Sequence, residues 1–189
     1  MKFLSYAFAA LVALASPVLA ADGNDYLTIQ LKSGPVVIEL LPKIAPKSVE
    51  RLEKLASEGK YDNVAFHRVI EGFMAQTGDV QYGNMKKGYD ASRVGTGSSD
   101  LPNLPAEFSK TPFVRGTVGM ARTQDPNSAN SQFFIMFGDG AFLNGQYTVV
   151  GKVVSGMDNV DKIKRGQGSN GEVSDPDRMI KVTVGRPAK

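Results

Sequence analysis

The sequence predicts a mainly β protein, in which short antiparallel strands close into a barrel that is capped by two α-helices. Two observations support this fold class. Short apolar runs, several of which alternate with polar residues, recur along the chain between turns rich in glycine. Only two segments space their apolar residues as an amphipathic helix does. With 189 residues, 42% of them hydrophobic, the chain can form one domain with a substantial core.

The N-terminus has the pattern of a secretory signal peptide. An apolar run over 3–15 follows Lys2, and small residues near Ala20 suit cleavage. We therefore expect residues 1–20 to be removed and residues 21–189 to form the mature domain. The run is short for a bilayer span, and no later segment approaches that length. An uncleaved N-terminal anchor is the alternative.

The first half of the chain predicts two hairpins and one helix. Residues 26–31 alternate apolar and polar side chains, and a Lys-Ser-Gly turn leads to a second run over 36–40. A proline then stands where a helix would begin, and apolar residues at helical spacing predict a helix over about 46–58. The runs 64–70 and 73–77, separated by Glu-Gly, predict the second hairpin.

The second half begins with a long irregular segment. Residues 78–111 are rich in glycine, serine and proline and show no periodic element. Loops of this length are uncommon in compact domains and often have a function. Four further strands and the second helix then follow, with strands over 117–121, 132–137, 148–154 and 179–184 and the helix over 156–164.

Composition argues against several classes of function. The chain has no cysteine, which removes thiol catalysis and thiolate metal sites. His67 is the only histidine, so a multi-histidine metal centre is not expected, and no Gly-x-Ser-x-Gly motif of a serine hydrolase is present. A formal net charge of +3 is too small to indicate nucleic-acid binding. We predict neither a metal nor a cofactor.

Arg68 is the most informative residue of the chain. It lies in an apolar run, and a guanidinium keeps its charge, so this placement is costly unless the side chain has partners or a task. Alternate residues of a strand share a face, so Phe66, Arg68 and Ile70 are expected to point the same way. A structural carboxylate paired with Arg68 is the alternative to a functional role.

Two of the predicted strands each place an amide beside an apolar side chain. Met74 shares a face with Gln76, and Gln132 shares one with Phe134. Alternation does not say which barrel face is inside, so the apolar members could be ordinary core, and the glutamines could simply satisfy backbone groups. As a surface, this set has no carboxylate pair, activated nucleophile or metal ligands, and its chemistry would be non-covalent.

Rotation about an Xaa-Pro bond suits such a surface. The barrier is about 18–20 kcal/mol because the C–N bond has partial double-bond character. In the twisted transition state the prolyl nitrogen regains its lone pair. A fixed cationic donor stabilises that state more than either planar form, while an apolar pocket holds the ring.

Several sequence blocks, in order, resemble the cyclophilins, the cyclosporin-type peptidyl-prolyl cis–trans isomerases, and most of all their secreted bacterial members. The resemblance extends over nearly all of 26–184. The blocks are FHRVI (66–70), GFMAQTGD (72–79), GTG (95–97), GMAR (119–122), NSQFFI (130–135) and LNGQYT (143–148).

The resemblance implies an eight-stranded antiparallel barrel closed by two helices, with an active groove on its outer face. It implies an isomerase (EC 5.2.1.8) that acts without a cofactor, as a periplasmic monomer, on proline-containing polypeptides during folding of exported proteins. Arg68 would be the catalytic arginine, assisted by Gln76 and Phe73. The substrate-binding residues would be His67, Met74, Ala121, Arg122, Gln132, Phe134, Phe142, Leu143 and Tyr147.

The chain departs from the familiar eukaryotic pattern at a few positions. Phe142 stands where those proteins have a tryptophan linked to tight cyclosporin binding, and phenylalanine lacks the indole donor, so we expect only weak cyclosporin binding. Tyr147 stands where a histidine usually lines the pocket, and Ala75 and Thr77 flank Gln76 in place of isoleucine and glycine. Two other functions stay open: a proline-peptide binding module or holdase chaperone with incidental catalysis, and a hollow barrel of lipocalin type.

Overall fold

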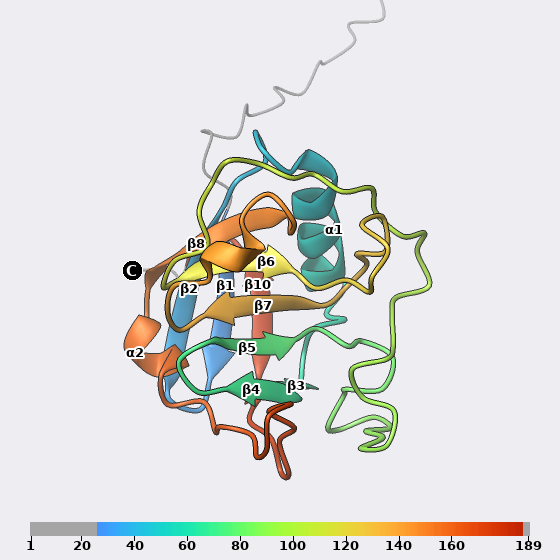
Figure 1. Cartoon of the computed structure of the whole chain (residues 1–189). Helices are drawn as coiled ribbons and strands as arrows, with labels where there is room; N and C mark the ends of the chain where they lie inside the picture. The colour runs from blue at the N-terminus through green and yellow to red at the C-terminus, as the bar shows by residue number, and fades with distance from the viewer. Residues whose placement is uncertain (1–25, 187–189) are drawn as a thin grey trace, which may run out of the picture.

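An eight-stranded antiparallel sheet forms the body of the structure, a computed structural model that describes residues 26–186 (Figure 1). Its strand order is β10-β1-β2-β8-β6-β7-β5-β4. The strands are β1 (Tyr26–Leu31), β2 (Gly34–Leu40), β4 (Arg68–Ile70), β5 (Met74–Thr77), β6 (Thr117–Met120), β7 (Phe133–Met136), β8 (Val149–Ser155) and β10 (Lys181–Val184).

A second, two-stranded ladder connects the two edges of this sheet. It pairs β3 (Val64–Ala65) with β9 (Arg178–Met179). Because β3 leads into edge strand β4 and β9 leads into edge strand β10, the ladder brings the two edges together. The predicted eight-stranded antiparallel architecture with two helices is confirmed as a curled, barrel-like sheet. Its edge strands β4 and β10 do not pair with each other, so full closure was overstated, and the β3–β9 ladder links the two edges.

Helix α1 spans Pro46–Ser57, close to the predicted 46–58. Proline suits the first helical turn, where its missing N–H would have no partner. The free N–H groups of Lys47 and Ser48 instead donate to the carboxylate of Glu107, each at 2.9 Å. Its apolar stripe packs on the barrel, with Val49, Leu52, Leu55 and Ala56 buried.

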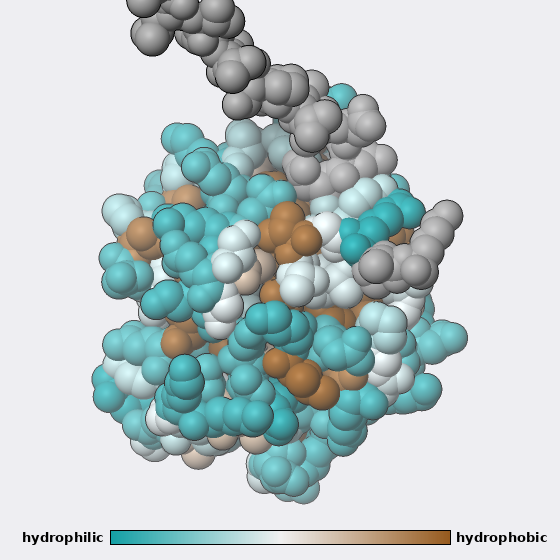
Figure 2. Space-filling view, turned by 180° about the vertical axis from the view of Figure 1, so that it is seen from behind, coloured by the Kyte–Doolittle hydropathy of each residue, from teal (hydrophilic) through white to brown (hydrophobic). Residues whose placement is uncertain are grey.

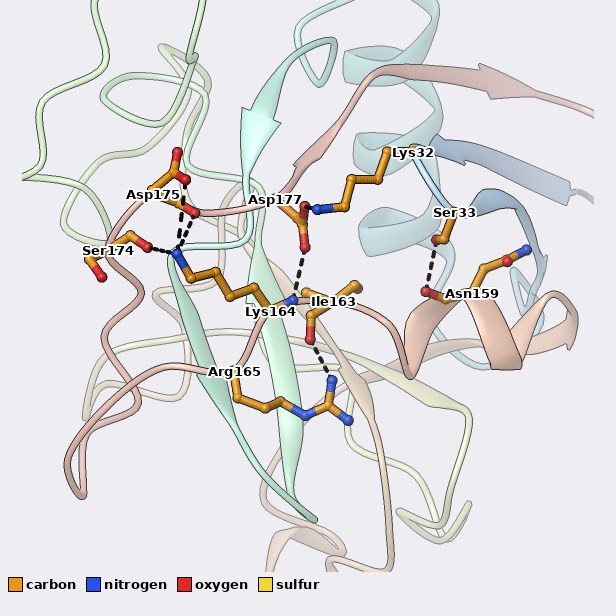
Figure 3. A network of polar contacts seen from close by, with 9 residues as sticks. All are labelled: Lys32, Ser33, Asn159, Ile163, Lys164, Arg165, Ser174, Asp175 and Asp177. Carbon is orange, nitrogen blue, oxygen red and sulfur yellow. Dashed lines mark hydrogen bonds and ion pairs between the residues drawn. The ribbon is translucent and has the colours of Figure 1, made fainter.

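The second helix is shorter than the predicted 156–164. Helix α2 spans only Met157–Val160, after which the Ile163 N–H donates to the Val160 carbonyl at 3.0 Å in a tighter turn. The Lys164 N–H then leaves the helical pattern and donates to the Asp177 carboxylate at 2.9 Å (Figure 3). Val160 and Ile163 are both buried, so the helical spacing identified the packed face but not the length.

Two apolar clusters cover opposite faces of the sheet. The larger occupies the barrel interior and includes alternate strand residues such as Val69, Ala75 and Ile135. The smaller lies on the outer face beside a 3₁₀ turn, Ala141–Leu143, and consists of Met74, Phe113, Phe134, Met136, Leu143 and Val149. Because neighbouring strand residues point to opposite faces, both clusters come from the same strands.

The run 64–70 is not one continuous strand, as the sequence suggested. Strand β3 pairs with β9, whereas β4 pairs with β5, so the chain changes partner at Phe66 and His67. The change of partner interrupts the alternation. Phe66 lies in the interior cluster, while Ile70 packs with the outer one, so the prediction that Phe66 shares a face with Arg68 is wrong. The predicted strand 179–184 is likewise divided between β9 and β10.

Between Thr77 and Thr117 the described chain has no helix or strand, as predicted for 78–111. This segment runs around one side of the barrel in Figure 1. The face seen from behind is mostly hydrophilic, with small separate hydrophobic spots (Figure 2). Among residues 26–186, none of the helices has the length and apolar character that a membrane span requires. The predicted signal peptide, 1–20, lies outside the described residues.

Candidate active site

Arg68 lies on edge strand β4, where it is partly buried, and hydrogen-bonds to neutral groups. Its Nη1 donates to the Gln76 Oε1 at 3.2 Å, and its Nε donates to the Asn170 carbonyl at 3.0 Å. No carboxylate within 26–186 forms an ion pair with it, so the structural ion-pair alternative is wrong for this part of the chain. Burial lowers the pKa of Arg68, partly offset by Tyr147, but a guanidinium stays charged at neutral pH.

A chain of hydrogen bonds continues from Arg68 along the outer face. Gln76 lies opposite Arg68 in the β4–β5 pair, and its Nε2 donates to the Gln132 Oε1 at 3.0 Å. The Gln132 Nε2 donates to the carbonyls of Gly95 and Gly97, at 3.0 and 2.8 Å. Each glutamine therefore has one fixed orientation, because its oxygen accepts and its amide donates.

Asp79 anchors the far end of this chain, and sequence reasoning did not single it out. Its fully buried carboxylate accepts four backbone N–H groups. Oδ2 accepts from Gly95 and Gly97, at 2.7 and 2.9 Å, and Oδ1 accepts from Gln81 and Tyr82, at 3.0 and 2.9 Å. The signal in the sequence was an acid two residues after a strand, at the start of a glycine-rich loop.

Most predicted site residues line one hollow of about 260 Å³ on the outer face. Its lining residues are Arg68, Phe73, Met74, Gln76, Ala121, Arg122, Phe134, Phe142, Leu143 and Tyr147. Gln132 lies in an adjoining hollow of about 320 Å³ that shares Gln76, Ala121 and Arg122 with the first and has Gly95 and Gly97 in its wall. The two hollows form a continuous groove beside the guanidinium.

Aromatic rings shape the first hollow. Phe134 stacks on buried Phe113, with ring centroids 5.7 Å apart and planes at 24°, and Tyr147 meets Phe134 edge-on at 6.0 Å. Phe142 contacts Phe73 at 5.4 Å and is 65% exposed, so it forms the rim. Phe113 lies between the irregular segment 78–111 and the strand predicted from 117, in no predicted element, which is why the sequence did not identify it. A pocket of this kind suits a flat aliphatic ring.

Arg122 is held at the surface by backbone oxygens. Its guanidinium donates to the carbonyl of Gln146 through Nε and Nη2, at 3.1 and 2.9 Å, and to that of Thr123 at 2.8 Å. It also lies over the Tyr147 ring, 4.4 Å from the centroid. These contacts hold the Arg122 side chain in place in the wall of the hollow.

His67 lies beneath the groove wall. The side chain is buried, and a Cβ on Gly95 would come within 3.1 Å of its Cδ2. Burial lowers the pKa of His67 to about 4, so the ring is neutral at pH 7. Neither ring nitrogen has a hydrogen-bond partner of normal geometry among the described residues. His67 also borders a hollow of about 310 Å³ that is lined by Arg68 and Asn170 as well.

The barrel and its groove together define a class of protein: a β-barrel that holds a fixed cationic donor beside an apolar pocket on its outer face. A model of the family described as "Cyclophilin type peptidyl-prolyl cis-trans isomerase/CLD" matches residues 26–184. The chain belongs to this family, and its activity is peptidyl-prolyl cis–trans isomerisation. Members bind proline-containing peptides.

Known relatives agree with this assignment. A probable peptidyl-prolyl cis-trans isomerase of Brucella suis is 68% identical over 166 residues, which cover 87% of this chain and 85% of the relative. Peptidyl-prolyl cis-trans isomerase B of Escherichia coli is 39% identical, over 73% of this chain and 83% of the relative. The crystal structure of a cyclophilin from Hirschia baltica matches with a TM-score of 0.69 and 26% identity, over 88% of this chain and 78% of that one.

Proposed function

We propose that Arg68 accelerates Xaa-Pro rotation by stabilising the twisted amide. The observation that carries this proposal is a partly buried guanidinium at the edge of an apolar hollow, paired only with neutral groups. Its Nη2 has no hydrogen-bond partner within 26–186. An uncompensated donor of this kind is available to the prolyl nitrogen when that atom regains its lone pair.

In this mechanism the proline ring enters the hollow formed by Phe73, Met74, Phe134 and Leu143. Gln76 orients the guanidinium, and Gln132 orients Gln76. The Arg122 main chain makes no hydrogen bond to another described backbone group, so it is free to pair with the peptide. No proton is transferred and no covalent bond forms, which agrees with a site that has no nucleophile and base within hydrogen-bonding distance.

The magnitude is set by the differential strength of one charge-assisted hydrogen bond. Such a bond contributes about 1.5–3 kcal/mol, and about 1.4 kcal/mol corresponds to a tenfold change in rate. Removal of a preorganised donor from an active site costs roughly 10²–10³-fold in rate. We therefore expect Arg68 to account for about two orders of magnitude of the acceleration.

The test is the Arg68→Ala variant, assayed by NMR exchange between the cis and trans forms of an Xaa-Pro peptide. We expect kcat/KM to fall by about 10², with little loss of fold because no ion pair is broken. Arg178→Ala is the control, since Arg178 also donates to an uncharged group, the Asn63 Oδ1 at 3.1 Å, but does not line the groove. If Arg68→Ala catalyses cis–trans exchange at the wild-type rate, the mechanism is refuted.

The same measurement distinguishes a binding module or holdase. Peptide affinity and exchange are recorded on one sample, and binding without exchange broadening of the proline signals would favour the module. A folding role for exported proteins in the periplasm is supported by the signal-peptide pattern of residues 1–20. Recovery of the protein in the cytoplasmic fraction after osmotic shock would contradict that location.

A further inference from the structure

The loop formed by residues 165–177 covers the free edge of β4, the strand that carries Arg68. In Figure 1 it lies directly beneath β4. Both main-chain groups of Val69 bond to this loop: its N–H donates to the Gly171 carbonyl at 2.7 Å, and its carbonyl accepts from the Gly166 N–H at 2.8 Å. The Val173 N–H donates to the His67 carbonyl at 3.1 Å. The loop is thus paired with the residues on either side of Arg68.

The same loop contacts the guanidinium directly. The Asn170 main-chain carbonyl accepts the Arg68 Nε–H at 3.0 Å, across 102 residues of sequence. A guanidinium is planar, and its donors lie in a rigid fork. Gln76 on Nη1 and Asn170 on Nε therefore fix the plane together, whereas Gln76 alone would leave the group free to pivot.

The outer end of the loop is tied to Lys164 and to the β1–β2 turn (Figure 3). The Lys164 Nζ donates to the carbonyls of Ser174 and Asp175, at 2.5 and 3.2 Å. The Asp177 carboxylate accepts the Lys164 N–H at 2.9 Å and pairs with the Lys32 Nζ at 2.7 Å. Lys32 belongs to the β1–β2 turn, so the loop is held between the barrel edge and a distant hairpin.

Gly171 is the closest approach of this loop to β4. A Cβ at Gly171 would lie 2.4 Å from the Ile70 Cγ1 and 2.9 Å from the Val69 carbonyl oxygen. Gly168, in the same loop, has a similar positive φ, +66° against +70°, but nothing lies within 4 Å of its Cβ position. Alanine would be strained equally by the backbone at both sites, and only at Gly171 would it push the loop from the strand.

We infer that residues 165–177 are a positioning element for Arg68, which set the plane of its guanidinium through the Asn170 carbonyl. This inference rests on the proposed catalytic role of Arg68. It adds a requirement that the groove residues alone do not contain: the donor is correctly aimed only while the loop is seated on β4.

The experiment compares Gly171→Ala with Gly168→Ala in the full chain. We expect Gly171→Ala to lower kcat/KM about tenfold relative to Gly168→Ala, equivalent to about 1.4 kcal/mol. The ¹⁵N NMR signal of the Arg68 Nε–H, assigned by its loss in Arg68→Ala, should shift and exchange faster with water only in Gly171→Ala. Faster exchange is expected because the Asn170 carbonyl no longer holds that proton.

If Gly171→Ala folds and its Arg68 Nε–H signal is unchanged, the inference is overturned. It is also overturned if that signal shifts but Gly171→Ala has the same kcat/KM as Gly168→Ala. If instead Arg68→Ala itself keeps wild-type activity, the proposed mechanism fails, while the Nε–H signal still reports whether the loop positions the side chain. Should Gly171→Ala not fold, Lys164→Met removes the two Nζ hydrogen bonds of the outer tether. Faster Nε–H exchange is then expected relative to Lys152→Met, which removes a surface ion pair with Glu39, and equal exchange would overturn the inference.

Discussion

Replacing Asp79 by asparagine should destabilise the groove wall and the fold with it. The carboxylate is fully buried and accepts two backbone N–H groups on each oxygen. Asparagine has the same shape, but one of its two terminal atoms is an NH₂ group that cannot accept. Two of the four N–H groups, either those of Gly95 and Gly97 or those of Gln81 and Tyr82, would face another donor.

The magnitude follows from those contacts. A hydrogen bond to a charged group contributes about 1.5–3 kcal/mol, so losing two should lower the free energy of unfolding by about 3–6 kcal/mol. A typical domain has only about 5–15 kcal/mol in total. The Gly95 and Gly97 carbonyls also accept hydrogen bonds from the Gln132 Nε2. Displacement of these two glycines should therefore make the Gln132 side chain, and through it the Gln76 side chain, less well ordered.

Urea unfolding followed by circular dichroism measures the change, and the isomerase assay is run well below the new midpoint. Asp90→Asn is the control, since Asp90 lies in the same irregular segment and accepts from the Ser92 N–H and hydroxyl near the surface. We expect Asp79→Asn alone to lower the midpoint strongly and to reduce kcat/KM. Equal midpoints for the two variants would refute the reasoning.

Two further predictions concern His67 and Phe142. His67 has a pKa of about 4 in the fold and about 6.5 when unfolded. The unfolded chain therefore binds the extra proton between these values, and stability should fall by about 2 kcal/mol from pH 7 to pH 5. Urea unfolding of His67→Gln, measured at pH 7 and at pH 5, should not show this loss of stability. The same loss in His67→Gln as in the wild type would contradict the prediction. Phe142→Trp adds an indole donor at the exposed rim and should tighten cyclosporin binding about tenfold. The chain has no other tryptophan, so fluorescence of the new indole measures the affinity, and an unchanged Kd would contradict the expectation.

Local pattern was sufficient for most elements of the fold. The alternation in 26–31 and the helical spacing in 46–58 gave β1 and α1 within a residue, because each element buries its own apolar face. The breaks inside 64–70 and 179–184 were missed because they come from a change of strand partner. Which strand a segment pairs with cannot be read from the order of apolar and polar residues in either run.

The residues of the site, like the elements of the fold, were predicted only in part from the sequence. Arg68, Gln76 and Gln132 were identified from chemical type and alternation, and the resemblance supplied the remaining groove residues. Asp79, Phe113 and the Asn170 carbonyl were not identified, because their roles depend on contacts across many residues of sequence. A backbone carbonyl in particular has no signature in the amino-acid sequence.

The amino-acid sequence was enough to predict which residue types could do the chemistry, and that Met74 shares a face with Gln76 and Phe134 with Gln132. That this shared face is the outer one was visible only in the folded protein. Both faces of the sheet are covered by apolar groups, one filling the barrel and the other forming the groove, so hydrophobicity does not distinguish them. Alternation reports that two faces differ, whereas closure of the barrel and the seating of the 165–177 loop decide which of them meets the substrate.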